Sequence, residues 1–91
     1  MDRDIVYKCI DSERDYQDSQ NNNWQHKGYP SVAAELLLME HYLVLTREKW
    51  VQTSDNDVCL DMIRKVVGIG IRCFENHGCM PRLPVTQKEN K

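Results

Sequence analysis

Two arginines and a lysine in one predicted helix have the spacing of an anion-binding site. Arg64 and Arg72 are eight residues apart, which is about two helical turns, and Gly68 lies between them. A guanidinium group can bind a phosphate or a carboxylate through two parallel hydrogen bonds, and Lys65 would add a third positive charge. The alternative is a solvated helix face with ion pairs between side chains three and four residues apart. The sequence leaves both interpretations open.

A second candidate group lies before the second predicted helix. Trp24 and Tyr29 could stack on a nucleobase, and Lys27 between them could pair with a phosphate. The alternative is that the two aromatic side chains pack over the helices and fasten the linker. Taken with the cations of the third helix, this pattern predicts a nucleotide-type ligand. The candidate ligand-binding residues are Arg64, Lys65, Arg72, Trp24, Lys27 and Tyr29.

The cysteines and histidines do not form a strong metal-binding motif. Cys73, His77 and Cys79 have the spacing C-x3-H-x-C, without the close cysteine pair that structural zinc sites usually contain. Whether these three residues bind a metal is left open by the sequence. Cys73 falls at an apolar position of its helix, so we do not expect it to act as a nucleophile. We therefore predict no catalytic residue and no cofactor.

Three helices are predicted to position these residues. Apolar residues recur at helical spacing over residues 2–18, 32–52 and 57–77, and strand patterns are nearly absent. The predicted fold is all-α, with a helical hairpin formed by the second and third helices and an added N-terminal helix.

The ends of the predicted hairpin helices carry typical capping residues. Ser31 is placed to cap the second helix, and Ser54 with Asp57 three residues later resembles a capping box for the third. Gly78 is placed to end the third helix in a left-handed conformation. Gly68, in the middle of that helix, indicates close approach of another backbone or a ligand, because glycine is otherwise unfavourable there.

The helices carry more apolar surface than one hairpin can bury. The N-terminal helix has a modest apolar stripe, and the second helix has two neighbouring stripes that cover more than half of its circumference. One partner helix cannot cover so wide a surface, so we predict a symmetric dimer or a higher oligomer. The stripes are formed by Ile5, Val6, Cys9, Ile10 and Tyr16 in the first helix, and by Val32, Leu36, Met39, Leu43 and Trp50 with Leu37, Val44 and Val51 in the second.

Length and composition bound the remaining possibilities. The chain has 91 residues, 41% hydrophobic and 29% charged, which predicts one soluble domain over residues 1–91 with a partly flexible tail at 79–91. Its net charge of -2 argues against general nucleic-acid binding. No apolar run is long enough to span a membrane, and no secretory signal is expected. Four cysteines without a close pair favour reduced thiols and a cytoplasmic location.

The hairpin resembles the paired helices of the MazG-like, all-α nucleoside triphosphate pyrophosphohydrolases. The resemblance covers roughly residues 31–77 and is carried by Ala34–Leu37 and by Val66–Glu75. Members of that family hold magnesium with an E-x-x-E motif on one helix and an E-x-x-D motif on another. The resemblance implies a diverged nucleotide pyrophosphohydrolase as the enzymatic alternative.

The acidic motifs of that family are incomplete in this chain. Glu35 is followed three residues later by Leu38 instead of an acid, and Glu40 is out of phase. On the later helix, the positions that correspond to the family's acids fall at Met62 and Lys65. Two lost carboxylates imply the loss of the metal site, so hydrolase activity is not the leading expectation.

Short segments also resemble small helical proteins of unassigned function from tailed phages. These segments are Ser31–Glu40, Ile63–Val66 and Glu75–Gly78. Small phage accessory proteins often counteract host defence, so the resemblance implies a non-enzymatic binding protein in the bacterial host cytoplasm. The leading expectation is sequestration of a nucleotide-type signal molecule. The alternative is direct inhibition of a host defence protein, with the acidic N-terminal helix as the contact surface.

Overall fold

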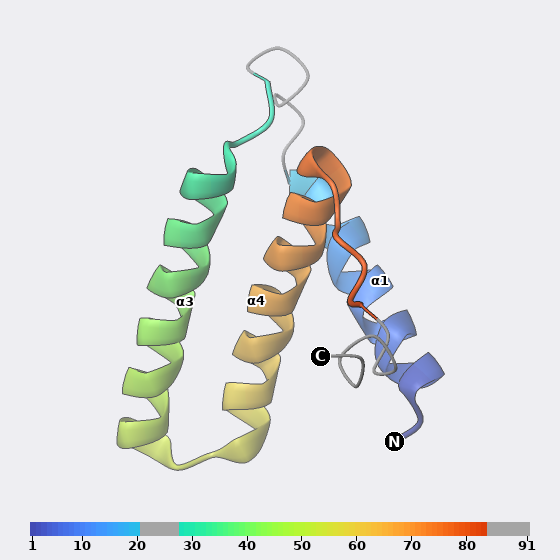
Figure 1. Ribbon diagram of the computed structural model, residues 1–91. Helices are drawn as coiled ribbons and strands as arrows, with labels where there is room; N and C mark the ends of the chain where they lie inside the picture. Colours follow the sequence, from blue (N-terminus) through green and yellow to red (C-terminus); the bar gives the residue numbers. More distant parts are fainter. Residues whose placement is uncertain (21–27, 84–91) are drawn as a thin grey trace, which may run out of the picture.

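The chain forms three α-helices and no strand within the residues that the structure describes. The computed structural model describes residues 1–20 and 28–83 (Figure 1). The helices are α1 (Arg3–Gln20), α3 (Val32–Thr53) and α4 (Asn56–His77). The all-helical prediction is confirmed, and the predicted bounds differ from the observed ones by at most two residues.

The caps explain where the two hairpin helices begin and end. The Ser31 hydroxyl accepts a hydrogen bond from the backbone N–H of Ala34 at 3.0 Å, as predicted for an N-cap. The predicted capping box at Ser54 is wrong, because Asp55 caps α4 by accepting hydrogen bonds from two backbone N–H groups. Ser54 instead adopts the left-handed conformation, with φ 51°, and closes α3 by donating its N–H to the Trp50 carbonyl.

The third helix ends as predicted at a glycine. The backbone N–H of Gly78 donates a hydrogen bond to the Phe74 carbonyl at 2.8 Å. Gly78 has a φ of 108° and a ψ of 157°, so it takes a positive φ but not the left-handed helical conformation that we expected. A residue with a side chain rarely adopts this φ, which explains a glycine at this position.

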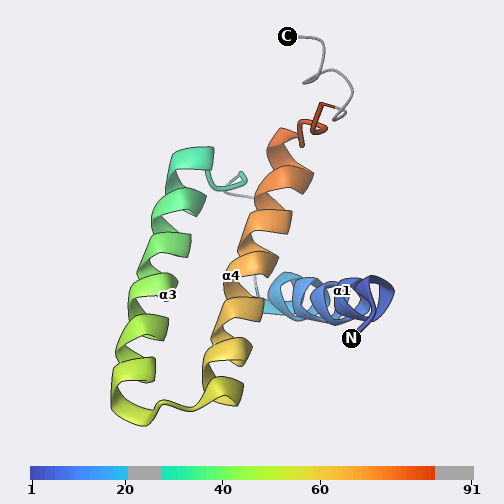
Figure 2. The same ribbon diagram turned by 60° about the horizontal axis from the view of Figure 1, so that its bottom comes forward.

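The helix α4 is the central element of the molecule. It lies beside α3 in a hairpin closed by the short turn at residues 54–55, while α1 crosses its other side at a steep angle (Figures 1 and 2). Within the described residues, the backbones of α1 and α3 each lie close to α4 but not to each other. Each outer helix therefore has only one helix to pack against.

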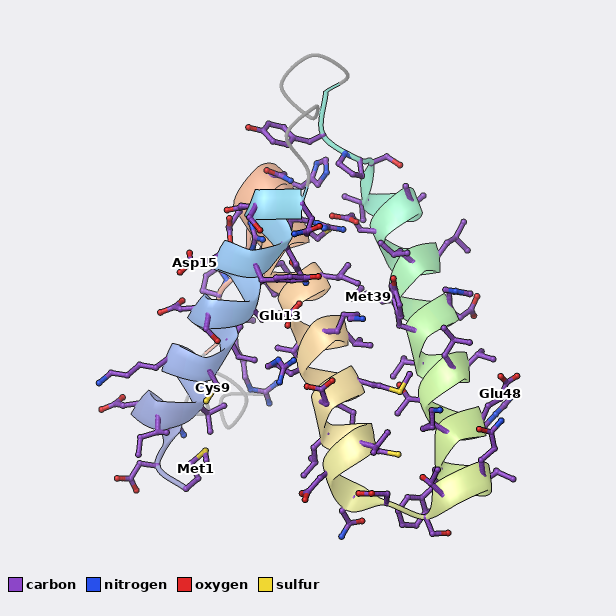
Figure 3. All side chains as sticks on the ribbon, turned by 180° about the vertical axis from the view of Figure 1, so that it is seen from behind. Met1, Cys9, Glu13, Asp15, Met39 and Glu48 are labelled. Atoms are coloured by element: carbon purple, nitrogen blue, oxygen red, sulfur yellow. The ribbon has the colours of Figure 1, made fainter. Side chains whose placement is uncertain are left out.

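The apolar core is small and lies between α3 and α4. The buried hydrophobic residues of the described chain are Cys59 and Ile69. The Cys59 thiol donates a weak hydrogen bond to the Thr46 carbonyl at 3.8 Å, and Met39 lies between the two helices (Figure 3). Cys9, which the sequence places on the apolar stripe of the N-terminal helix, is exposed on α1.

Most large apolar residues of the three helices stay in contact with solvent. Leu37 and Val51 of α3 are 63% and 78% exposed, and Leu60 of α4 is 60% exposed. All four cysteines are free thiols. No helix of the described residues is both long and apolar enough to cross a membrane. The three helices thus leave a large apolar surface that one copy of the chain does not cover.

Candidate functional site

The contact between α1 and α4 is mainly polar. The guanidinium of Arg14 donates two hydrogen bonds to the carboxylate of Glu75, at 2.8 and 2.9 Å, and one to Asp18 at 2.9 Å. These hydrogen bonds lower the pKa of the Glu75 carboxyl group and raise the pKa of Arg14. A bidentate pair of this kind fixes the position and the direction of both side chains.

A second group of polar contacts lies closer to the middle of α4. The carboxylate of Glu13 accepts hydrogen bonds from Arg64 at 3.0 Å and from Gln17 at 3.1 Å. Gln17 also donates to the Lys65 carbonyl at 3.3 Å. Glu13 points from α1 toward α4, whereas Asp15 lies on the opposite side of α1 (Figure 3). The hydrogen bond to Glu13 is the main reason that the pKa of Arg64 is raised.

Gly68 allows α1 to approach α4 closely. A Cβ atom at this position would lie 2.7 Å from Glu13 Cγ and 2.7 Å from Gln17 Nε2. Both distances are too short for real Cβ contacts, so any larger residue would displace these side chains. We expected another backbone or a ligand at Gly68, and the structure places two side chains of α1 there instead.

Glu35 of α3 and Arg72 of α4 form a buried ion pair. Two guanidinium nitrogens of Arg72 donate to the two carboxylate oxygens of Glu35, each at 2.6 Å. The two residues are 1% and 4% exposed. Because removal of either charge would leave the other unpaired in a low-dielectric environment, this pair must form whenever the hairpin is closed.

The structure shows where most of the predicted ligand-binding residues lie. Arg64 and Arg72 are held by carboxylates of α1 and α3, and the ammonium group of Lys65 lies 5.0 Å from the centre of the Tyr42 ring. Tyr29 is exposed, and Trp24 and Lys27 lie outside the described residues. The face of α4 that carries the three cations is thus its contact face toward the other helices.

A cavity of about 520 Å³ lies among the three helices. Its charged lining residues are Glu13, Glu35, Lys65 and Arg72, so positive and negative side chains occur in equal number. Its size suits a small ligand, but the lining provides no excess of positive charge among the described residues. This balance does not favour a multiply charged phosphate.

Sequence reasoning missed the acidic partners of the cations. In the sequence, Glu13 and Glu35 look like ordinary surface acids. The spacing of an acidic residue along a helix is the same whether its carboxylate faces water or a positively charged side chain of another helix. One signal was available for Glu35, which shares a helix face with Met39 and Tyr42, four and seven residues later. An acid on a face with such neighbours indicates a buried partner.

An apolar groove of about 530 Å³ opens between the N-terminal half of α1 and α4. α1 diverges from α4 toward its N-terminus, which leaves this side of the contact open (Figure 2). The sequence predicted a modest apolar stripe on this helix, and the structure leaves residues of that stripe along the groove while the polar residues Glu13, Arg14 and Gln17 are buried. The groove is lined by Met1, Val6, Tyr7, Cys9, Ile10, Asp57, Leu60, Asp61, Ile63, Arg64, Val67 and Ile71.

The described residues hold no group of three or more potential metal ligands. The residues Cys73, His77 and Cys79 do not gather into such a group. His77 instead places its Nε2 atom 2.7 Å from the Pro30 carbonyl, which joins the end of α4 to the segment before α3. His77 thus makes a structural contact between two segments of the chain.

Comparison with protein-family models, curated proteins and solved structures finds no match for this chain. The resemblances to MazG-like pyrophosphohydrolases and to tailed-phage proteins therefore stay predictions from the sequence.

Proposed function

We propose that the chain is a non-enzymatic binding protein whose target is another protein. The groove between α1 and α4 accepts an amphipathic helix of that target, with apolar residues on the inner side and lysine or arginine at the edges. The observation that carries this proposal is the apolar lining of the groove, in which Leu60, Ile63 and Val67 stay 41 to 60% exposed. An apolar surface rimmed by polar groups is typical of a protein interaction site.

The charge around the groove supports a basic target. Residues 2–18 contain six acidic and three basic residues, and α4 begins with Asp55, Asp57 and Asp61. Two of these acids, Asp57 and Asp61, line the groove together with Arg64, which pairs with Asp61 at 2.6 Å. The charged side chains of the lining therefore carry one net negative charge, from Asp57. Acidic rims attract basic partners, and complementary charge increases the association rate and selects against acidic competitors.

The polar contacts favour this binding mode over nucleotide sequestration. Phosphate binding by Arg72 would require the guanidinium to leave Glu35 and would leave a buried carboxylate unpaired. Arg64 is likewise engaged by Glu13 and Asp61. The same reasoning supports a non-enzymatic function, because Glu35 is the acid that aligns with the hydrolase motif and its carboxylate is held by Arg72.

The experiment is a titration with a model peptide that has the chemistry of the proposed target. A fluorescently labelled amphipathic peptide of leucine and lysine is titrated with the full chain, and binding is followed by fluorescence anisotropy. We expect binding that weakens with added salt, because exposed charges are screened. A peptide with glutamate in place of each lysine should bind much more weakly.

Two matched variants locate the binding surface. Leu60→Gln changes the groove, and Leu37→Gln makes the same change at a leucine of nearly equal exposure on α3. We expect Leu60→Gln to weaken peptide binding about tenfold, which corresponds to about 1.4 kcal/mol, and Leu37→Gln to leave it unchanged. Absence of peptide binding, or equal loss in both variants, would contradict the proposal.

A further inference from the structure

The outer face of α3, turned away from α4, carries a regular apolar pattern. Its exposed apolar residues recur every seven positions in two rows, and Glu40 and Arg47 lie between the rows, also seven residues apart. Seven residues make almost two helical turns, so each row runs nearly parallel to the helix axis. The rows are Leu36, Leu43 and Trp50, and Leu37, Val44 and Val51.

This face is self-complementary when two copies run in opposite directions. Suppose that the midpoint between Leu43 and Val44 lies on a two-fold axis. Two residues then face each other across the interface when they lie at equal distances from this midpoint, one before it in one copy and one after it in the second copy. The apolar positions then meet only apolar positions. The pairs are Leu36 with Val51, Leu37 with Trp50, and Leu43 with Val44.

The two charged residues of the face select the direction. In the antiparallel arrangement, Glu40 of each copy faces Arg47 of the other, and both pairs join opposite charges. In a parallel arrangement, Glu40 would face Glu40 and Arg47 would face Arg47. Like charges placed opposite each other destabilise an interface, so the pattern favours the antiparallel arrangement.

We infer that a second copy of the chain covers the outer face of α3, with the two α3 helices antiparallel about an axis near residues 43 and 44. In a symmetric dimer, the same patch of both copies forms the interface, so this patch must be complementary to itself. The outer face of α3 meets this requirement, because apolar residues face apolar residues and opposite charges face each other. Within the described residues, α3 contacts only α4, so the face is open to a second copy. Glu48, beside this face, also points away from α4 (Figure 3).

The dimer leaves the groove between α1 and α4 open in both copies. α1 and α3 lie on opposite sides of α4 (Figure 1). The groove is lined by residues of α1 and α4 and by Met1, and by none of α3, so it does not compete with the α3 contact. The inference does not depend on the proposed function, since the two faces share no residue. Leu37→Gln and Leu60→Gln therefore separate the two proposals: the first weakens the dimer alone, and the second weakens peptide binding alone.

The test is sedimentation velocity of the full chain over a range of concentrations. We expect a species of twice the 10.7 kDa chain mass. Glu40→Arg and Arg47→Glu should each weaken dimerisation roughly tenfold or more, because each creates two like-charge contacts. The double variant Glu40→Arg with Arg47→Glu should restore the dimer, because it exchanges the two charges and rebuilds both pairs. Helicity measured by circular dichroism should stay unchanged in all of these exposed-site variants.

Three results would overturn the inference. The first is a monomer at every concentration. The second is a dimer that tolerates both single charge changes, since another face would then form it. The third is a double variant that stays as weak as the single variants, which would exclude the antiparallel pairing of Glu40 with Arg47.

Discussion

At the scale of single residues, the buried pair of Glu35 and Arg72 is the most constrained feature of the molecule. Its two hydrogen bonds join α3 to α4 inside a hairpin whose apolar core is small. A buried ion pair adds little net stability, but it is costly to break from one side. Its main effect is therefore to fix how the two helices align.

We expect Arg72→Met to lower the free energy of unfolding by about 3–5 kcal/mol, because Glu35 would stay buried without its partner. The double variant Glu35→Leu with Arg72→Met should recover most of this loss, since it buries neither charge. Urea unfolding followed by circular dichroism measures both values. If the single and double variants are equally unstable, the unpaired charge is not the cause of the loss.

The pair of Arg14 and Glu75 predicts a dependence of stability on pH. Hydrogen bonds from Arg14 lower the pKa of Glu75 in the folded chain, so this contribution is present at pH values above the ordinary glutamate pKa of about 4.3. It is lost as the pH falls through the lowered pKa of the folded state. Glu75→Gln should therefore be less stable than the parent chain at neutral pH, and the difference should shrink in acid. A difference that stays constant with pH would show that the ion pair does not contribute.

At the scale of helices, Gly68 and Gly70 offer a matched pair of substitutions. Alanine at either position should gain about 1 kcal/mol of helix propensity. At Gly70 the new Cβ would lie 3.5 Å from Met39 Sδ, an ordinary contact, whereas at Gly68 it would meet Glu13 and Gln17 at 2.7 Å.

We expect Gly68→Ala to be less stable than Gly70→Ala by about 1–3 kcal/mol, which is the usual cost of overpacking. Thermal unfolding of the two variants measures this difference. Loss of the contact between α1 and α4 should appear as faster hydrogen exchange of α1 in Gly68→Ala alone. Equal stability of the two variants would contradict the close approach of α1 to α4.

The helices themselves follow from the sequence more directly than their contacts do. Apolar spacing and capping residues predict each helix, and Ser31 caps α3 as expected. The partners of Arg64 and Arg72 could not be predicted in the same way, because the spacing of charges along one helix does not show which residues of other helices lie opposite. Residues 36 to 51 show the same limit: their apolar rows indicate a contact, but not which surface provides it.

The apolar stripe of α1 shows why the candidate site was missed. Ile5, Val6 and Ile10 have the spacing of a core-facing stripe, yet α1 packs through Glu13, Arg14 and Gln17. The polar residues form the contact because Gly68 leaves room for α1 beside α4 and because the charged side chains have partners of opposite charge there. The apolar stripe lines only one side of the groove between α1 and α4. We assign binding to the space in this groove that the chain leaves unfilled.

The molecule as a whole has two separate apolar surfaces, to which we assign different occupants. We propose that the outer face of α3 pairs with a second copy and that the groove between α1 and α4 binds a basic amphipathic helix. A dimer would thus present two grooves, so a target with two binding segments would be held more tightly than either segment alone.

Binding of a basic helix in the groove between α1 and α4 is tested most directly by a nuclear magnetic resonance titration of the isotope-labelled chain with the leucine–lysine peptide. Backbone amide shifts report where the peptide binds. We expect shift changes along the groove, in the N-terminal half of α1 and around Leu60, Ile63 and Val67 of α4. Shift changes confined to the outer face of α3 or to the central cavity, or no changes at all, would contradict this expectation.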